Sequence, residues 1–114
     1  MKLFSSSRII LQNVDLGEIK VSMPIADLKG STSGPTVVIT AGMDGDEYTG
    51  ILAAYDLIEH YSNTPFQGRI VVLPVMNIPG FYAGTSLNPE DGKFPKYIFP
   101  GSSSGSSTER LLHW

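Results

Sequence analysis

The stretch TVVITAGMDGDEYTG, residues 36–50, decides the fold of this chain. It begins with a β-branched run that is typical of a strand, continues through a turn with two glycines, and enters an amphipathic pattern. The turn also holds three carboxylates, Asp44, Asp46 and Glu47. Because ligands in α/β proteins collect at the carboxyl ends of sheet strands, this turn is the first candidate for a functional site.

The segments that follow predict a βαβ unit. Residues 47–61 place apolar side chains at helical spacing, with Asp56 and Glu59 on the opposite face, which predicts a helix. The breaker SNTPFQG then leads into RIVVLPV, residues 69–75, a second apolar run. Continuous β-branched runs are typical of strands covered on both faces, so we expect both strands to be parallel neighbours inside a sheet.

The N-terminal part predicts two further strands, at residues 8–11 and 18–28. The second of these alternates, with one face made of Ile19, Val21, Met23 and Ile25. Pro24 cannot donate to a ladder, so we expect it at an edge or a bulge. Residues 29–35 are rich in glycine and serine and predict a turn.

The segment after the second buried strand is rich in proline, glycine and asparagine and predicts a long loop. Its aromatic residues Phe94, Tyr97 and Phe99 are expected to plug a core, with the lining of an apolar pocket as the alternative. Ser106 and Glu109 form a capping-box pattern that predicts a last helix, although the serine-rich stretch around Ser106 could also be a linker. The predicted organisation is a single domain, residues 1–114, with N-terminal strands at 1–35, a βαβ core at 36–76, a long loop at 77–105 and a C-terminal helix at 106–114.

Composition excludes several classes of protein. A chain of 114 residues with 41% apolar and 17% charged residues has the length and content of one globular domain. A net charge of -3 with scattered basic residues offers no surface for nucleic acid. The chain has no cysteine, no apolar run long enough for a signal peptide and no segment that could span a membrane, so we expect a cytoplasmic location.

Three strings carry a family resemblance: GPTVVITAGMDGDEYTGILAA, RIVVLPVMNIPGFYAGTSLNPEDGKFPKYIFPG and GSSTERL. In this order, from about Glu18 onward, the chain resembles the succinylglutamate desuccinylase and aspartoacylase family of zinc carboxypeptidase-like hydrolases. The resemblance implies an α/β fold with a βαβ-containing mixed sheet flanked by helices. It also implies a zinc-bound water that attacks the amide of an N-acyl amino acid, a glutamate that handles protons, and arginines that hold the substrate carboxylate.

The metal motif of that family departs from its pattern here. The family sequence is GxHGxE, in which histidine and glutamate both bind zinc, and the matching residues are GMDGDE at 42–47. Glu47 is retained, but Asp44 stands in place of the histidine. The third zinc ligand and the catalytic glutamate lie, in family members, beyond the point where this chain ends.

The arginine motif departs as well. The family sequence DGxDLNRxFPG is matched at its ends by Asp91, Gly92, Phe99, Pro100 and Gly101. Its centre is replaced by Phe94, Pro95, Lys96 and Tyr97. Ser86 occupies another position where the family often has an arginine. The clamp for a substrate carboxylate is therefore missing.

These departures predict loss of the chemistry. A catalytic zinc site needs about three protein ligands, and only one family ligand remains. We therefore expect no catalytic residue, no zinc cofactor, and a truncated, inactive relative retained as a binding or assembly module. Two alternatives stay open, namely a metal-dependent hydrolase of this family completed by another subunit, and a partial reading frame whose product still folds.

The acidic turn has two interpretations. Asp44, Asp46 and Glu47 could bind a hard divalent cation such as magnesium, manganese or calcium, with Asp44 and Glu47 as a residual metal site. Helix capping by these carboxylates is the favoured prediction, because acidic groups complement a helix N-terminus. His60 is interpreted as a complement to the end of its helix dipole, and His113 has no ligand partner nearby in the sequence.

Two further predictions concern contacts. Asn77 is expected to shape its loop by hydrogen bonds to the backbone. Sheet edges and apolar surface that remain uncovered in a shortened fold invite pairing, so we expect a homo-oligomer, with Trp114 as an anchor or interface group. Any small-molecule ligand is unknown.

Overall fold

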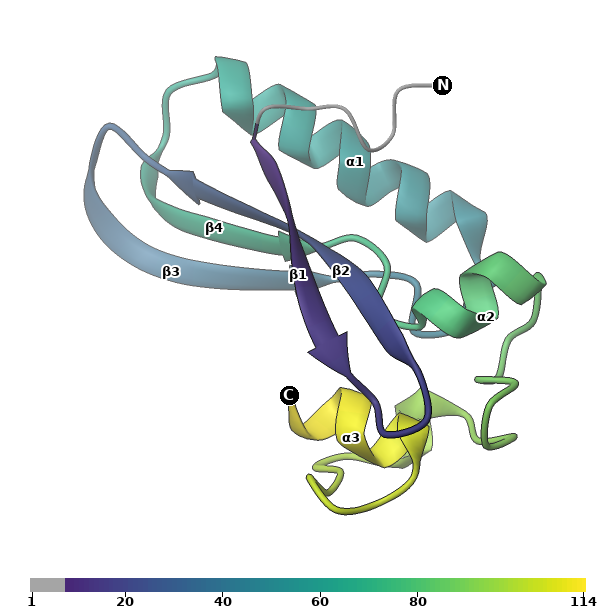
Figure 1. Cartoon of the computed structure of the whole chain (residues 1–114). Helices are drawn as coiled ribbons and strands as arrows, with labels where there is room; N and C mark the ends of the chain where they lie inside the picture. The colour runs from purple at the N-terminus through teal and green to yellow at the C-terminus, as the bar shows by residue number, and fades with distance from the viewer. Residues whose placement is uncertain (1–7) are drawn as a thin grey trace.

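The computed structural model describes residues 8–114, which form a four-stranded mixed sheet crossed on one face by a long helix (Figure 1). The elements in chain order are β1 (Ile9–Asp15), β2 (Lys20–Lys29), β3 (Thr32–Thr40), α1 (Tyr48–Asn63), β4 (Gln67–Leu73), α2 (Ile78–Ala83), the 3₁₀ turn η1 (Pro95–Tyr97) and α3 (Ser107–His113). The predicted α/β class, with a mixed sheet flanked by helices, is confirmed.

The sheet has the order β1-β2-β4-β3. β1 and β2 form an antiparallel hairpin, β4 joins β2 in antiparallel pairing, and only β3 and β4 are parallel. β3, α1 and β4 therefore make the predicted βαβ unit. Because β3 and β4 run in the same direction, the turns that follow them emerge at the same edge of the sheet.

The core lies between α1 and the sheet. The buried residues of α1 recur at helical spacing: Ile51, Ala54, Tyr55 and Ile58. They belong to one apolar cluster with buried strand residues that include Met23, Ala26, Leu28 and Val72. Burial of each large aliphatic side chain contributes roughly 1.5–3 kcal/mol, so this face of α1 is what fixes the helix on the sheet.

Strand β3 differs from its prediction in two ways. It begins at Thr32, so part of the predicted turn at residues 29–35 belongs to the strand, with a register shift against β4 between Thr32 and Thr36. The predicted cover on both faces is wrong, because β3 lies at the sheet edge and the side chains of Val37 and Val38 are 48% and 61% exposed. A β-branched run favours a strand but does not reveal which elements will cover it.

Strand β2 changes its buried face at Pro24. The predicted inward residue Ile25 is only half buried, whereas Met23, Pro24, Ala26 and Leu28 are buried. β4 pairs with β2 only from Ala26 onward, so Pro24 lies where β2 is bonded to β1 alone, as expected for a residue without an N–H. β1 is also longer than the predicted 8–11 and continues to Asp15.

The segment predicted as a long loop contains α2, η1 and an isolated bridge between Asn88 and Lys93. Pro79 and Gly80 favoured a loop in the sequence, but a proline in the first turn of a helix loses no hydrogen bond. The predicted last helix is present as α3, and its capping box is confirmed because Ser106 N donates to Glu109 Oε2 at 2.6 Å.

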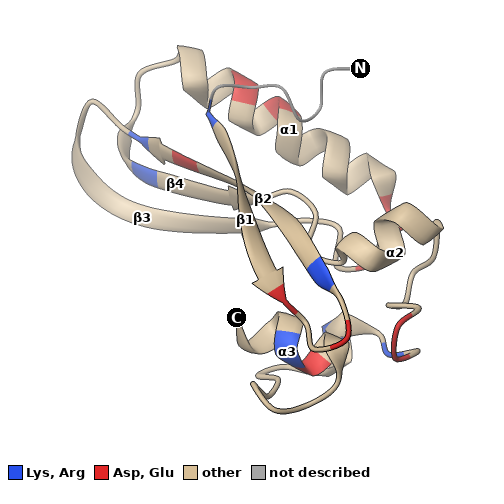
Figure 2. Cartoon of the chain, in the orientation of Figure 1, with Lys and Arg blue, Asp and Glu red and all other residues tan. Residues whose placement is uncertain are grey.

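Charged residues are distributed over several elements. Figure 2 shows Lys and Arg interleaved with Asp and Glu, while β3 carries no charged residue. No helix within residues 8–114 combines the length and the apolar composition needed to cross a bilayer.

Candidate functional site

The turn between β3 and α1 is held by main-chain hydrogen bonds to the segment that follows β4. Met76 N donates to Ala41 O and Asn77 N donates to Gly42 O, both at 2.9 Å. Gly42 has a φ of 66°, a left-handed conformation that glycine adopts without strain. The parallel arrangement of β3 and β4 thus places this turn beside α2 and the loop after it.

Gly45 brings the turn into direct contact with α2. A Cβ atom at this position would overlap the carbonyl carbon of Gly80, so no larger residue fits. Gly45 N also donates to Ser86 O at 3.3 Å. The second glycine of the turn is therefore required by packing rather than by a ligand.

Asn77 links the same elements through its side chain. It is fully buried, its Oδ1 accepts from Gly80 N at 3.1 Å, and its Nδ2 donates to Ser86 O at 3.0 Å. The first bond caps the N-terminus of α2. The predicted role of this amide in shaping the loop is confirmed.

Asp44 projects from this turn into an ion pair with Lys96. The Asp44 side chain is 10% exposed, and its Oδ2 accepts from Lys96 Nζ at 2.9 Å. Its other oxygen, Oδ1, is buried and has no hydrogen-bond partner among residues 8–114. Lys96 Nζ also lies 5.5 Å from the ring centres of Phe94 and Tyr97. A buried carboxylate needs a nearby positive charge, and Lys96 supplies it.

The electrostatics of the pair keep the lysine charged. The hydrogen bond from Lys96 to Asp44 raises the pKa of the ammonium, partial burial lowers it, and the negative charge of Asp44 raises it further. The net result is a pKa above the usual lysine value. The site therefore contains a permanent cation at neutral pH.

The other two carboxylates of the turn point elsewhere. Asp46 is exposed and accepts from Ser86 Oγ at 2.8 Å, while Glu47 is the exposed N-cap residue of α1. Within the described chain, residues 8–114, no three His, Cys, Asp or Glu side chains are grouped so that they could hold a metal ion. The structure therefore does not bring Asp44, Asp46 and Glu47 together.

The favoured helix-capping role is correct only in position, because Glu47 is the N-cap residue of α1, and the predicted capping hydrogen bonds are wrong. The N-cap residue Glu47 makes no side-chain cap hydrogen bond, and the first turn of α1 holds no acidic residue. The physical reason is that Asp44 and Asp46 are bound by side chains far along the sequence, Lys96 and Ser86.

The prediction that the aromatic residues of the loop plug a core is also wrong. Phe94, Tyr97 and Phe99 are 37%, 76% and 58% exposed, so they do not plug a core, and the first two lie beside the Lys96 ammonium. Of the histidines, His60 lies in the last turn of α1, as predicted, and His113 lies in the last turn of α3.

Lys96 is the site residue that the sequence did not identify. Its ion pair joins positions 52 residues apart, and no local pattern reports such a contact. A signal did exist, because Asp44 and Lys96 both depart from the family motifs and carry opposite charges.

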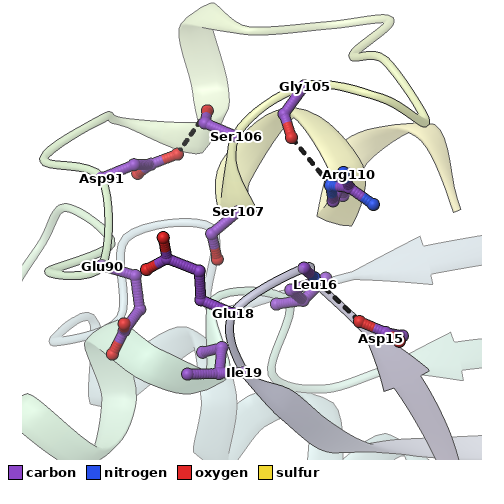
Figure 3. A pocket seen from close by; sticks show the side chains of 11 residues that line it. Asp15, Leu16, Glu18, Ile19, Glu90, Asp91, Gly105, Ser106, Ser107 and Arg110 are labelled. Atoms are coloured by element: carbon purple, nitrogen blue, oxygen red, sulfur yellow. Dashed lines mark hydrogen bonds between the residues drawn. The ribbon is translucent and has the colours of Figure 1, made fainter.

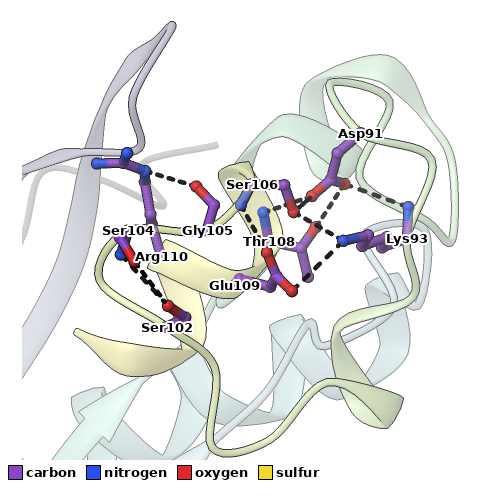
Figure 4. Close-up of polar contacts among 9 residues, drawn as sticks. All are labelled: Asp91, Lys93, Ser102, Ser104, Gly105, Ser106, Thr108, Glu109 and Arg110. Carbon is purple, nitrogen blue, oxygen red and sulfur yellow. Dashed lines mark hydrogen bonds and ion pairs between the residues drawn. The ribbon is translucent and has the colours of Figure 1, made fainter.

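Asp91, the retained aspartate of the second motif, accepts hydrogen bonds that join the loop to the start of α3 (Figure 4). Its carboxylate accepts from Ser106 Oγ, Thr108 N and Thr108 Oγ1, each at 2.7 Å, and from Lys93 N at 3.2 Å. Burial raises the pKa of this carboxyl, but the hydrogen bonds from Thr108, Ser106 and Lys93 outweigh burial and leave the pKa below its usual value. Asp91 thus fastens the loop to the start of α3.

A cavity of about 580 Å³ lies between the β1–β2 turn and the start of α3 (Figure 3). Carboxylates from Asp15, Glu18 and Glu90 line it, together with Arg110, whose Nε donates to Gly105 O at 2.7 Å. These acidic groups do not form a metal-ligand set within residues 8–114. The Asp44–Lys96 pair is therefore the stronger candidate site.

The fold and the turn after β3 define a domain of the zinc carboxypeptidase-like class. Residues 33–113 match the profile of the succinylglutamate desuccinylase/aspartoacylase catalytic domain, and the chain belongs to this family.

Three individual relatives support the family assignment. The chain is 38% identical over 94 residues to an N-alpha-acetyl-L-2,4-diaminobutyric acid deacetylase from Halomonas elongata. A solved succinylglutamate desuccinylase/aspartoacylase from Rhodobacter sphaeroides superposes with a TM-score of 0.81 at 34% identity and covers 92% of this chain. An aspartoacylase family protein from Mesorhizobium loti gives a TM-score of 0.82 at 27% identity and covers 99%.

All three relatives are much longer than this chain. The matched region covers 82% of this chain but only 27% of the deacetylase, and this chain corresponds to 33% and 37% of the two solved proteins. The chain therefore spans about a third of the length of its relatives.

Within residues 8–114, the residues that match the family's metal motif do not by themselves make up the ligand set of a zinc ion. Asp44 Oδ2 already accepts from the Lys96 ammonium, Asp44 Oδ1 has no partner among residues 8–114, and Glu47 is exposed and not grouped with two further ligands there. A catalytic zinc needs about three protein ligands and an open position. The Lys96 ammonium instead forms an ion pair with Asp44.

Proposed function

We propose that this chain is a non-catalytic member of the family that serves as a binding or assembly module. The observation that carries the proposal is the Asp44–Lys96 ion pair, which puts a tethered cation at the residue that replaces the family's zinc-binding histidine. The pair gives one oxygen of Asp44 a cationic partner from the chain itself.

The chemistry of an ammonium group supports this assignment. Zinc activates water by coordinating it and lowering its pKa, and it polarises a carbonyl as a Lewis acid. Lys96 can donate hydrogen bonds but has no orbital to coordinate water. Tyr97 stands where the family motif has a carboxylate-binding arginine, so a forked contact to a substrate carboxylate is missing too.

A second candidate is a hydrolase completed by another subunit. Its support is that Glu47 is retained and that a relative at 38% identity is named as a deacetylase. In this case the missing ligands and the general base would come from another chain, and the activity would be hydrolysis of an N-acyl amino acid.

Metal content and turnover distinguish the two. The protein is purified without chelator, its metal content is measured by mass spectrometry, and N-acetyl-2,4-diaminobutyrate and N-succinylglutamate are supplied as substrates. We expect no stoichiometric metal and no release of the acyl group. Stoichiometric zinc together with turnover would overturn the proposal.

A pair of variants sharpens this test. Asp44→His restores the family residue at its motif position, but it should not restore turnover because Lys96 and Tyr97 remain. Asp46→His is the matched control, since it adds a histidine to the same turn at an exposed position. Turnover in Asp44→His but not in Asp46→His would show that the site is one substitution away from activity, against our reasoning.

The place of this module is proposed from composition. A chain without cysteine is compatible with a reducing compartment, and we place the protein in the cytoplasm. A fluorescent fusion followed by cell fractionation checks this location.

A further inference from the structure

Lys96 carries a positive charge to the turn after β3. It belongs to η1, and its ammonium donates to Asp44 Oδ2 at 2.9 Å. Both members of this contact lie within the described chain, so the contact does not depend on which elements cover the sheet elsewhere. Lys96 thus connects two segments that are 52 residues apart in the sequence.

Asp44 requires positive charge at this place. Its side chain is only 10% exposed, so its ionised form has lost most of its contact with water. Lys96 satisfies Oδ2, whereas Oδ1 is buried and has no partner among residues 8–114. A buried carboxylate without compensation is destabilising, so the unsatisfied oxygen leaves Asp44 with the capacity to bind a stronger cation.

Glu47 adds to the negative field around the same ammonium. The hydrogen bond to Asp44 makes the largest contribution to the raised pKa of Lys96, and the charges of Asp44 and Glu47 raise that pKa further. Glu47 makes no side-chain cap hydrogen bond, so capping does not hold its carboxylate away from this place. The ammonium therefore lies in the field of two carboxylates of the turn.

The chemistry of these carboxylates suits a hard divalent cation. Ions of the magnesium type bind through one or two carboxylates and keep several of their waters, so they need fewer protein ligands than zinc. Such a site does not require the group of three ligands that is missing from residues 8–114. What opposes the cation is the Lys96 ammonium, which already holds Asp44 Oδ2.

We propose that the Lys96 ammonium is an internal counter-ion that blocks a latent divalent-cation site at Asp44 and Glu47. This inference rests on the non-catalytic assignment above and names the residue that keeps a metal ion out of the turn. A divalent ion about 4 Å from an ammonium loses more than about tenfold in affinity, even at the dielectric constant of water. The rings of Phe94 and Tyr97, with centres 5.5 Å from the ammonium, favour its position.

Manganese binding to a lysine variant tests the proposal. Mn²⁺ prefers oxygen ligands, and the electron paramagnetic resonance signal of the free ion falls when the ion binds. Lys96→Ala removes the ammonium and leaves room for the ion, so it should bind Mn²⁺ at least about tenfold more tightly than the wild-type chain does. Its thermal midpoint should also rise with Mn²⁺ concentration, because an ion that binds only the folded chain stabilises it.

Two further variants control for charge and folding. Lys93→Ala is the matched control, since Lys93 is 39% exposed against 42% for Lys96 and is also paired with a carboxylate, that of Glu109. Its Mn²⁺ affinity should equal that of the wild-type chain, because the nearby Asp91 carboxylate already accepts four hydrogen bonds. Lys96→Gln keeps a hydrogen-bond donor for Asp44 without the charge, so it should fold even if Lys96→Ala does not, and its Mn²⁺ affinity should also increase.

The outcomes separate this inference from the function proposed above. Adding Asp44→Asn to Lys96→Ala should abolish the gain in Mn²⁺ affinity. Equal Mn²⁺ affinity in the wild-type chain and both Lys96 variants, a gain in Lys93→Ala, or a gain that survives Asp44→Asn overturns the inference. Such a result leaves the non-catalytic assignment in place, whereas stoichiometric zinc with turnover in the wild-type chain overturns both.

Discussion

Replacing Asp91 by asparagine measures how much the hydrogen bonds of Asp91, between the loop and α3, stabilise the fold. Each carboxylate oxygen of Asp91 accepts two hydrogen bonds, from Ser106 and Thr108 on one side and from Thr108 and Lys93 on the other. In Asp91→Asn one oxygen becomes an NH₂ group that confronts two donors. Thr108 is fully buried, so no water can replace Asp91 as the hydrogen-bond acceptor of its N–H.

The magnitude follows from the bonds removed. A hydrogen bond to a charged group contributes about 1.5–3 kcal/mol, and a hydroxyl donor can rotate to another acceptor whereas a main-chain N–H cannot. We expect Asp91→Asn to lower the free energy of unfolding by about 2–4 kcal/mol. Urea unfolding followed by circular dichroism, at one fixed protein concentration, measures the loss.

A control variant separates these hydrogen bonds from a general charge effect. Asp46→Asn alters an exposed carboxylate that accepts a hydrogen bond from Ser86 Oγ. We expect it to change stability by less than about 0.5 kcal/mol. If Asp91→Asn costs no more than this control, the reasoning about these hydrogen bonds is refuted.

The same variant predicts a pH dependence. The pKa of Asp91 is lower in the folded chain than its usual value, so its stabilisation is fully present above the unfolded pKa and is lost as pH falls through the folded pKa. Wild-type stability should therefore decrease in acid more steeply than that of Asp91→Asn. Asp27 and Glu109, whose pKa values are also lowered, contribute to both proteins and cancel in the difference.

Three further predictions concern the turn after β3. Gly45→Ala should lower the free energy of unfolding, measured by urea unfolding, by about 2–3 kcal/mol, because the added methyl overlaps the main chain of Gly80. An unchanged free energy of unfolding would show that α2 can move away. Asn77→Ala should cost about 1–3 kcal/mol, since it leaves the buried N–H of Gly80 without its cap, and amide exchange in α2 should quicken. Lys96→Met should lower the free energy of unfolding, and the loss should be smaller when Asp44→Asn is also present. Equal losses with and without Asp44→Asn would mean that the two side chains have no interaction free energy.

The sequence predicted the elements whose signals are local. The spacing of Ile51, Ala54, Tyr55 and Ile58 placed α1 within a residue or two of its ends, and Ser106 with Glu109 marked the start of α3. These signals depend on residues within one or two turns of each other. Local periodicity and capping chemistry were therefore sufficient for them.

The failures arose where distant segments decide the outcome. Val37 and Val38 are exposed because no element within the described part of the chain covers them, and their own run of residues does not report this. The partners of Asp44 and Asp46 lie 52 and 40 residues away, so the competition between capping and pairing could not be judged from the turn alone. The family pattern identified the turn but not the lysine that occupies it.

The bonds that hold the turn after β3 have a consequence for how this family can diverge. The carbonyls of Ala41 and Gly42 are fixed by N–H groups of Met76 and Asn77, and main-chain bonds of this kind are indifferent to the side chain at Asp44. A histidine can therefore give way to an aspartate without loosening the backbone. Main-chain atoms hold the shape of this turn, whereas side-chain atoms carry its reactivity. Such a domain can therefore change its chemistry and keep its shape.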